Sequence, residues 1–175
     1  MLFRPLNADE IEVRVAQVTD KGCSLLLYKD SRVDMRILDE TVGQESWQKR
    51  FYEYKGTLFC SVGIRLQMRD GSGSEWVWKD DAGAPSNMEA EKGEASDAFK
   101  RACFNWGIGR ELYTSPFIWA SNSKCVIKQG KNGKPACYDR FKVEKIRIED
   151  GVITGLAIKN ENTDHLVFTW VKEGA

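Results

Sequence analysis

The chain has 175 residues, enough for one domain with a sizeable core, and its 42% hydrophobic and 30% charged residues exclude wholesale disorder. Its 26 basic and 26 acidic residues cancel, so no global field attracts nucleic acid or an anionic membrane. Any site for a polyanion must therefore arise from local segregation of charge.

The N-terminal part of the chain predicts two strands and a helix. Residues 10–18 alternate apolar and charged side chains, which is typical of a half-buried strand, with a short helix as the alternative. Residues 21–30 have the apolar run of a buried strand. Residues 31–44 then predict a helix, because their apolar side chains recur at helical spacing and Gly43 suits the position just past its end.

Three strands joined by tight turns are expected next, over residues 47–54, 57–68 and 75–80. The middle strand alternates closely between apolar and other side chains, which predicts one buried face. The apolar members of that face are Leu58, Cys60, Val62, Ile64, Leu66 and Met68.

A long helix is predicted over residues 92–106, after a linker-like loop at residues 82–87. Its apolar residues recur at the i, i+3, i+4, i+7 spacing of a buried stripe. They are Ala95, Ala98, Phe99, Ala102, Cys103 and Trp106. Gly107 and Gly109 follow and are expected to end the helix.

The C-terminal part predicts three short strands, over residues 138–148, 152–158 and 165–171. The order of all elements predicts an α+β fold in one domain. We expect a β-β-β-α core, an antiparallel meander packed on the long helix, with additional N-terminal and C-terminal strands.

The outer face of the long helix carries the strongest candidate for a binding site. Lys100 and Arg101 are adjacent cations, and Phe104 follows them at helical spacing. Single-stranded nucleic acid is commonly held in this way, because cations track the phosphates while an aromatic ring stacks on a base. The alternative is a solvated helix face on which Asp97 pairs with Arg101 and Phe104 packs on a neighbouring element.

The segment KGEASDAFKRACFNWGIGRELY, residues 92–113, resembles the signature helix of the Rad52-type single-strand annealing proteins, in particular their bacterial and phage (Sak-like) members. The segment LLLYKDSRVDMRILDETVGQESW, residues 25–47, is similar to the strand-into-helix segment of that family. The three predicted strands match the family's β-β-β-α core in order and spacing, so the resemblance covers residues 25–113. It implies a single DNA-binding and annealing domain over residues 1–175, in which residues 123–175 form a smaller β extension.

The resemblance implies an annealing protein of homologous recombination and DNA repair, not an enzyme. Such a protein binds single-stranded DNA without ATP or another cofactor and assembles into an oligomeric ring. An exonuclease of a phage or a single-strand binding protein is a candidate partner. No GxxxxGK[ST] motif is present, which excludes a recombinase driven by ATP through that phosphate loop.

The resemblance also implies roles for individual residues. Lys100 and Arg101 occupy the family's adjacent basic pair, which contacts the DNA backbone. Further basic positions of the family correspond to Lys92, Arg32 and Arg69. Phe104 stands where the eukaryotic members have a third basic residue. We therefore expect Phe104 to replace a phosphate contact by stacking on a base.

Acidic side chains are expected away from this DNA-binding surface or at subunit contacts, among them Asp80, Asp81 and Glu94. Segregation of this kind would reconcile a net charge of zero with binding to a polyanion.

Two alternative functions remain open from the residues alone. Glu53 and Lys55, with Asp39 upstream, would suit a magnesium-dependent nuclease of recombination, in which carboxylates hold the metal and the lysine lies near the attacking water. The same two residues are also ordinary for a hairpin turn. An oligomeric accessory protein that does not bind DNA is the other alternative, and six tryptophans would suit its interfaces.

Residues 123–138 contain four lysines, Lys124, Lys128, Lys131 and Lys134, and no acidic residue. They predict either a second DNA contact or a solvated hairpin loop.

Five cysteines without a CxxC motif, and the single histidine His165, argue against a structural zinc site, and no metal is expected. Cys60 and Cys103 are expected to be buried thiols, while Cys125 and Cys137 would face each other across the lysine-rich loop. The chain shows no signal pattern and no long apolar run, which predicts a cytoplasmic protein with reduced cysteines.

Overall fold

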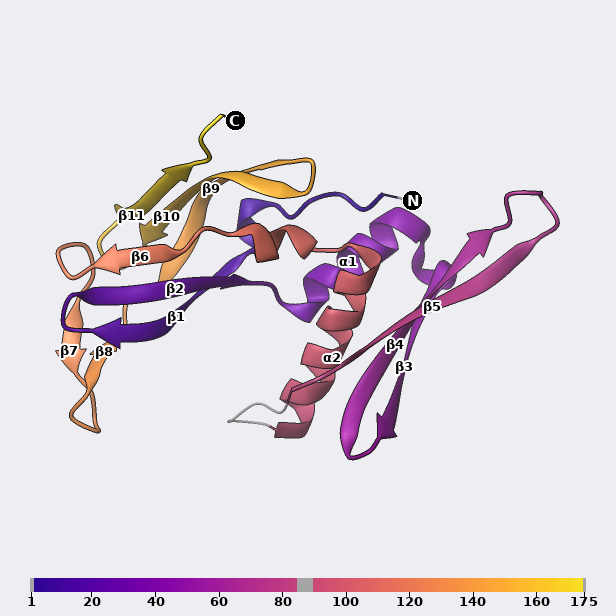
Figure 1. The fold of residues 1–175 in the computed structure, drawn as a ribbon, viewed down its shortest axis with the longest axis horizontal. Helices are drawn as coiled ribbons and strands as arrows, with labels where there is room; N and C mark the ends of the chain where they lie inside the picture. Colours follow the sequence, from indigo (N-terminus) through magenta and orange to yellow (C-terminus); the bar gives the residue numbers. More distant parts are fainter. Residues whose placement is uncertain (1, 85–89, 175) are drawn as a thin grey trace. The chain divides into compact units, whose positions relative to one another are not determined.

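The computed structural model describes residues 2–84 and 90–174, and for residues 90–92 it describes the backbone only. The chain divides into two compact units (Figure 1). The first unit contains the N-terminal residues up to Arg4 together with Asp30–Gly109, and the second contains Pro5–Lys29 and the chain from Arg110 onward. Residues 85–87, the last of the predicted linker, lie outside the described residues.

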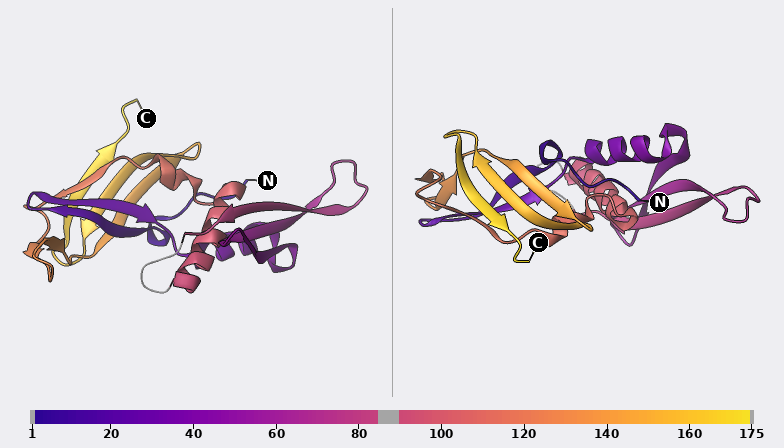
Figure 2. Two further views of the ribbon diagram at one scale, coloured as in Figure 1. Left: turned by 60° about the horizontal axis from the view of Figure 1, so that its bottom comes forward. Right: turned by 90° about the horizontal axis from the view of Figure 1, so that it is seen from above.

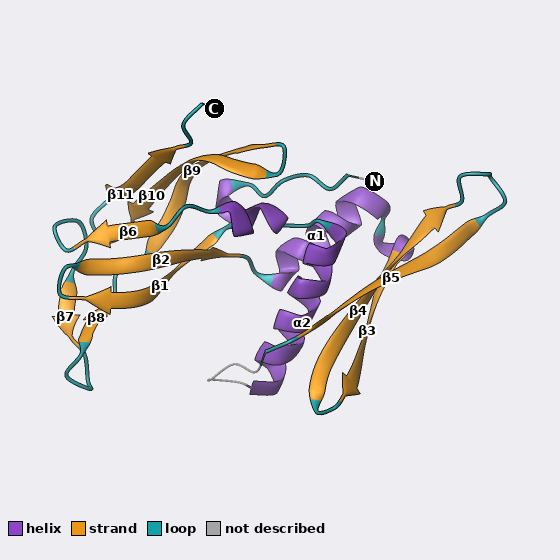
Figure 3. Ribbon diagram, in the orientation of Figure 1, coloured by secondary structure: helices purple, strands orange, loops and turns teal. Residues whose placement is uncertain are grey.

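The first unit contains helices α1 (Ser31–Val42) and α2 (Ala90–Trp106) and a three-stranded antiparallel sheet (Figure 3). The strands lie in the order β3 (Trp47–Tyr54), β4 (Thr57–Gln67) and β5 (Ser74–Ala82). A short 3-10 helix, η2 (Gln44–Ser46), connects α1 to β3. Helix α2 packs on β4 and β5. The segments predicted as helices and strands in this region overlap the observed ones.

Both ends of helix α1 are marked by residues that favour a helix terminus. The side chain of Asp30 accepts a hydrogen bond of 2.8 Å from the backbone N–H of Arg32, which satisfies one of the unpaired donors at the N-terminus. Gly43 ends the helix at a φ of 84°, where a side chain would strain the backbone. The start of α1, which forms part of the site described below, is therefore set by local sequence.

The core of the first unit lies where α2 packs on β4. Cys60, Val62 and Ile64 are fully buried, as are the helix residues Ala98, Phe99, Ala102 and Cys103. The buried stripe predicted for α2 is thus confirmed from Ala98 to Cys103, whereas Ala95 and Trp106 at its ends are half-buried. The predicted burial of Cys60 and Cys103 is confirmed.

The apolar face predicted for β4 is buried only in its middle. Leu58 and Leu66 are half-buried and Met68 is 37% exposed. The reason is length, because 11 strand residues extend about 36 Å, whereas the 17 residues of α2 cover about 25 Å. The prediction of a single buried face was also wrong in the middle of β4, where Gly63 on the other face is buried against the ring of Trp78.

The second unit is built on a six-stranded antiparallel sheet in the order β11-β10-β9-β1-β2-β6. Its strands are β1 (Glu12–Thr19), β2 (Gly22–Tyr28), β6 (Ile118–Ser121), β9 (Phe141–Glu149), β10 (Val152–Asn160) and β11 (His165–Val171). A separate two-stranded hairpin consists of β7 (Ile127–Gln129) and β8 (Pro135–Cys137). Two 3-10 helices, η1 (Ala8–Glu10) and η3 (Arg110–Thr114), complete the unit.

The C-terminal strands are present close to their predicted ranges, and they belong to the six-stranded sheet. Strand β9 pairs with β1 through Glu12 and Lys142, so that the N-terminal hairpin and the C-terminal meander share one sheet. Figure 2 shows these strands from two further directions. Periodicity along a single strand does not reveal which distant strand will pair with it, and so the sequence did not indicate this sheet. Across the described residues, none of the helices combines the length and the apolar character needed to span a bilayer.

Candidate nucleic-acid interface

A groove of about 660 Å³ lies in the first unit between the start of α1, strand β3 and helix α2. Its walls are formed by Asp30, Ser31 and Arg32 from α1, by Lys49 and Phe51 from β3, and by Ala95, Ser96 and Phe99 from α2. Three elements that are predicted separately from the sequence thus meet at one concave surface.

Lys49 provides a fixed positive charge in this groove. Its Nζ atom lies 4.4 Å from the centroid of the buried Phe99 ring and 6.0 Å from that of Phe51. The Phe99 ring in turn stacks on Trp47, with ring centroids 6.1 Å apart. A lysine ammonium group is attracted to an aromatic face, so these contacts hold the charge against the wall of the groove.

Sequence reasoning missed Lys49. A lysine on an edge strand is commonly a solvated residue, and β3 is an edge strand of its sheet. The one available signal was the alternation Trp47, Lys49, Phe51, which places the lysine on the same face as two aromatic residues.

Arg32 and Lys100 add charge at the same groove. The Arg32 side chain is 82% exposed, and its Nε atom lies 2.8 Å from Oδ1 of Asp30. The hydrogen bonds from Arg32, and to a smaller extent the charge of Lys100, lower the pKa of Asp30. Arg32 and Lys49 line the groove, and the charge of Lys100 reaches Asp30 in its wall. Three cations therefore act at the groove against one carboxylate, and the groove as a whole attracts anions.

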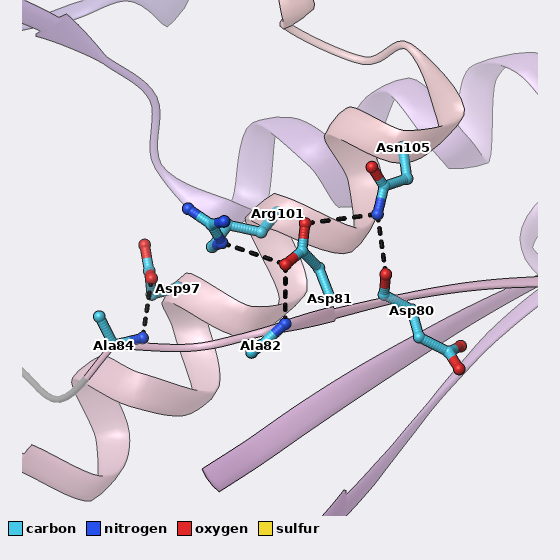
Figure 4. Close-up of polar contacts among 7 residues, drawn as sticks. All are labelled: Asp80, Asp81, Ala82, Ala84, Asp97, Arg101 and Asn105. Atoms are coloured by element: carbon cyan, nitrogen blue, oxygen red, sulfur yellow. Dashed lines mark hydrogen bonds and ion pairs between the residues drawn. The ribbon is translucent and has the colours of Figure 1, made fainter.

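Arg101 faces a different neighbour. Its Nε atom lies 3.3 Å from Oδ1 of Asp81 on β5 (Figure 4). Asn105, one turn further along α2, donates from Nδ2 to the carbonyl oxygen of Asp80 at 2.8 Å and to Oδ2 of Asp81 at 3.3 Å. One turn earlier, Asp97 accepts a hydrogen bond of 3.0 Å from the backbone N–H of Ala84.

Asp97, Arg101 and Asn105 thus form a stripe at i, i+4, i+8 that attaches α2 to the end of β5 (Figure 4). The alternative in which Asp97 pairs with Arg101 was wrong, because Asp97 bonds Ala84, just after β5, and Arg101 pairs with Asp81 on β5. The expectation that acidic residues lie away from the candidate cations also fails for Asp81. Lys100 acts on Asp30 at the groove, whereas Arg101 pairs with Asp81 on β5. The two adjacent cations therefore have different neighbours.

The other predicted contact residues are placed as follows. Phe104 is half-buried on α2. Arg69 lies in the exposed turn between β4 and β5, which projects beyond α2 (Figures 1 and 2). The side chain of Lys92 lies outside the described part of the structure. The structure therefore brings Arg32 and Lys100 together with Lys49, and it places Arg69 away from them.

The geometry does not support the nuclease alternative. Glu53 is exposed at the end of β3, and Lys55 occupies the following turn with a φ of 53°. Asp39 accepts a hydrogen bond of 2.7 Å from the indole nitrogen of Trp47. Within the described residues, the one cluster of three or more side chains that could hold a metal consists of cysteines and contains none of these groups.

The lysine-rich segment includes the hairpin of β7 and β8, and all four of its lysines are exposed. Both expectations for this segment, a second DNA contact and a solvated loop, are compatible with exposure.

The sequence model of the Rad52/22 family double-strand break repair protein matches residues 1–131, which is 131 of the 175 residues. The match includes α1, α2 and the three strands β3 to β5, and hence every residue of the groove. A comparison with curated proteins gave no match.

Proposed function

The chain belongs to the Rad52/22 family of double-strand break repair proteins, and on this basis we propose that it binds single-stranded DNA and anneals complementary strands. The protein does so without ATP and as an oligomeric ring, and it makes and breaks no covalent bond. The observation that carries the proposal is the groove lined by Arg32 and Lys49, with Lys100 close by. Strands β3, β4 and β5 with helix α2 are the β-β-β-α core of the family.

The three cations of the groove hold the phosphates of one DNA strand. Lys49 is held over Phe99 before DNA arrives, so little side-chain entropy is lost when it binds a phosphate. Arg32 can exchange Asp30 for a phosphate, because an exposed ion pair contributes only about 0–1 kcal/mol. Arg101 can exchange Asp81 for a phosphate at a similar cost. Lys92 and Arg69 are further backbone contacts in this proposal.

Two aromatic residues are candidates for stacking on bases. Phe51 lines the groove beside Lys49 and is 44% exposed, so part of its ring is accessible. Phe104 is half-buried and follows Lys100 by one helical turn. A stacked base contributes about 1–3 kcal/mol, which corresponds to about a 5- to 160-fold change in affinity.

The Phe51→Ala and Phe104→Ala variants separate these two residues. Loss of affinity within that range at high salt, where phosphate contacts contribute least, identifies the ring that stacks. If Phe104→Ala leaves both affinity and annealing unchanged, then Phe104 only packs within the protein.

Annealing follows from binding of the backbone. Cations that neutralise phosphates lower the repulsion between two strands and therefore the barrier to pairing. The bases remain available for pairing, and the formation of base pairs supplies the free energy. No nucleophile, metal or nucleotide is needed for this mechanism.

The experiment is the annealing of two complementary oligonucleotides in the absence of ATP, at fixed salt. The wild type is compared with Lys49→Ala/Lys100→Ala and with the matched control Lys142→Ala/Lys145→Ala, whose lysines are exposed on β9. We expect acceleration by the wild type and the control, and its loss in the groove variant. No acceleration by the wild type, or equal acceleration by all three folded proteins, would refute the proposed function. Light scattering on the same samples tests the ring.

A further inference from the structure

Three thiols meet in the second unit, although their residues are far apart in the sequence. The Sγ atoms of Cys23, Cys125 and Cys137 all lie within 4.8 Å of one another, and those of Cys23 and Cys125 are 3.9 Å apart. Cys23 is fully buried, Cys125 is 5% exposed, and Cys137 is half-buried. The cluster is thus closed on one side and accessible on the side of Cys137.

Three different elements build this cluster. Cys23 is on β2, in register with Ala120 of β6. The chain turns after β6, where the backbone N–H of Cys125 donates to the carbonyl oxygen of Ser121 at 3.1 Å, and this turn brings Cys125 back to β2. Cys137 ends β8 and pairs with Ile127 of β7, so the hairpin places it beside Cys125. The expectation that Cys125 and Cys137 face each other across this loop agrees with the geometry.

The spacing of the sulfur atoms suits a tetrahedral metal ion. Zinc–sulfur bonds are about 2.3 Å long, so two thiolates at the corners of a tetrahedron are about 3.8 Å apart. The observed 3.9 Å between Cys23 and Cys125 is close to this value, and contraction of the remaining separations from at most 4.8 Å requires only small side-chain movements. Thiolates are soft ligands that favour Zn²⁺ over Mg²⁺ or Ca²⁺.

We propose that Cys23, Cys125 and Cys137 form a zinc site of three thiolates, whose fourth position is open to water on the side of Cys137. The carboxylate of Asp139 lies beside Val126, the residue that follows Cys125. Its Oδ2 atom accepts hydrogen bonds of 2.8 Å from the backbone N–H of Val126 and from Nδ2 of the buried Asn160, which hold it in place.

The sequence contains no local signal for this arrangement, because the three cysteines lie on separate elements and far apart along the chain.

Binding of the ion would also fix the β7–β8 hairpin to the six-stranded sheet. The hairpin carries the exposed residues Lys128, Lys131 and Lys134. Lys128 and Lys131 are sites for trypsin, whereas Lys134 is not, because Pro135 follows it. Zn²⁺ should consequently protect the hairpin from cleavage, independently of whether the protein binds DNA.

The test uses the full chain, reduced and freed of metal with a chelator, and titrated with Co²⁺ and then Zn²⁺. We expect one equivalent of Co²⁺ to produce thiolate-to-cobalt charge-transfer absorption, Zn²⁺ to abolish it, and trypsin cleavage of the hairpin to slow. Cys137→Ser removes the half-buried ligand with a nearly isosteric residue, and Cys60→Ala, in the other unit, is the control.

The loss of a ligand should weaken Zn²⁺ binding by more than about 100-fold, since outer-shell partners alone contribute about 10- to 100-fold. Circular dichroism checks that Cys137→Ser is folded, and Cys125→Ser serves as a second variant. The proposal is wrong if the reduced wild type shows no charge-transfer absorption. It is equally wrong if both cysteine variants keep the absorption of the wild type.

Discussion

Removal of Lys49 and Lys100 should reduce the salt dependence of DNA binding by a predictable amount. Both lysines act at the groove between α1, β3 and α2, Lys49 as part of its wall and Lys100 through its charge on Asp30. Each phosphate that a protein neutralises on single-stranded DNA contributes about −0.7 to the slope of log K against log salt concentration. The double alanine variant should therefore lower the magnitude of the slope by about 1.4 for each protomer on the strand.

This slope difference converts into affinities. Between 50 and 200 mM salt the concentration rises fourfold, and a slope difference of 1.4 corresponds to about a sevenfold difference in affinity. The wild type should thus lose about seven times more affinity than the variant over this range. A strand that spans several protomers multiplies the effect, so a short oligonucleotide gives the clearest measurement.

Fluorescence anisotropy of a labelled oligonucleotide at four or more salt concentrations measures the slope. Lys142→Ala/Lys145→Ala should retain the slope of the wild type. A groove variant that binds more weakly with an unchanged slope would refute the reasoning, because the two lysines would then act through the fold and not through phosphates.

The Arg101→Ala variant tests whether Arg101 leaves Asp81 to bind a phosphate. If Arg101 exchanges Asp81 for a phosphate, the slope falls by a further amount of about 0.7. If Arg101 remains with Asp81, the slope stays that of the wild type. Stability should fall by no more than about 1 kcal/mol in either case, since both side chains of this pair are partly exposed.

Four further predictions concern Gly63, Trp47 and Cys60 of the first unit. Gly63→Ala should lower the free energy of unfolding by about 1–3 kcal/mol in a urea titration, because its Cβ atom would lie 2.7 Å from ring carbons of Trp78; an unchanged stability would show that the ring can move. Trp47→Phe removes the 2.7 Å hydrogen bond to the Asp39 carboxylate and should cost about 1.5–3 kcal/mol in the same assay, whereas a smaller loss would indicate that water replaces the indole. Burial raises the pKa of the Cys60 thiol to about 12, so iodoacetamide at pH 8 should alkylate this residue only after unfolding, as mass spectrometry of the peptide would show. The unfolded chain releases this proton above about pH 8.5 while the native protein retains it, and the contribution of Cys60 to stability should therefore decline from that pH upward.

The elements of the first unit could be predicted from sequence because their signals are local. Asp30 and Gly43 mark the ends of α1, and the apolar stripe from Ala98 to Cys103 marks the buried face of α2. The same helix pattern carried the family resemblance, and the family match over residues 1–131 confirms it. Signals of this kind depend only on residues within a few turns of one another.

Only the tertiary structure decided how side chains meet across elements. Lys49 became part of a groove because β3 lies beside Phe99, and Arg101 faces Asp81 because α2 packs on β5. The three cysteines come together because β2, the turn after β6 and the β7–β8 hairpin adjoin. Each of these contacts depends on strand register and helix packing, which are set by the burial of the whole core and not by the residues next to each side chain.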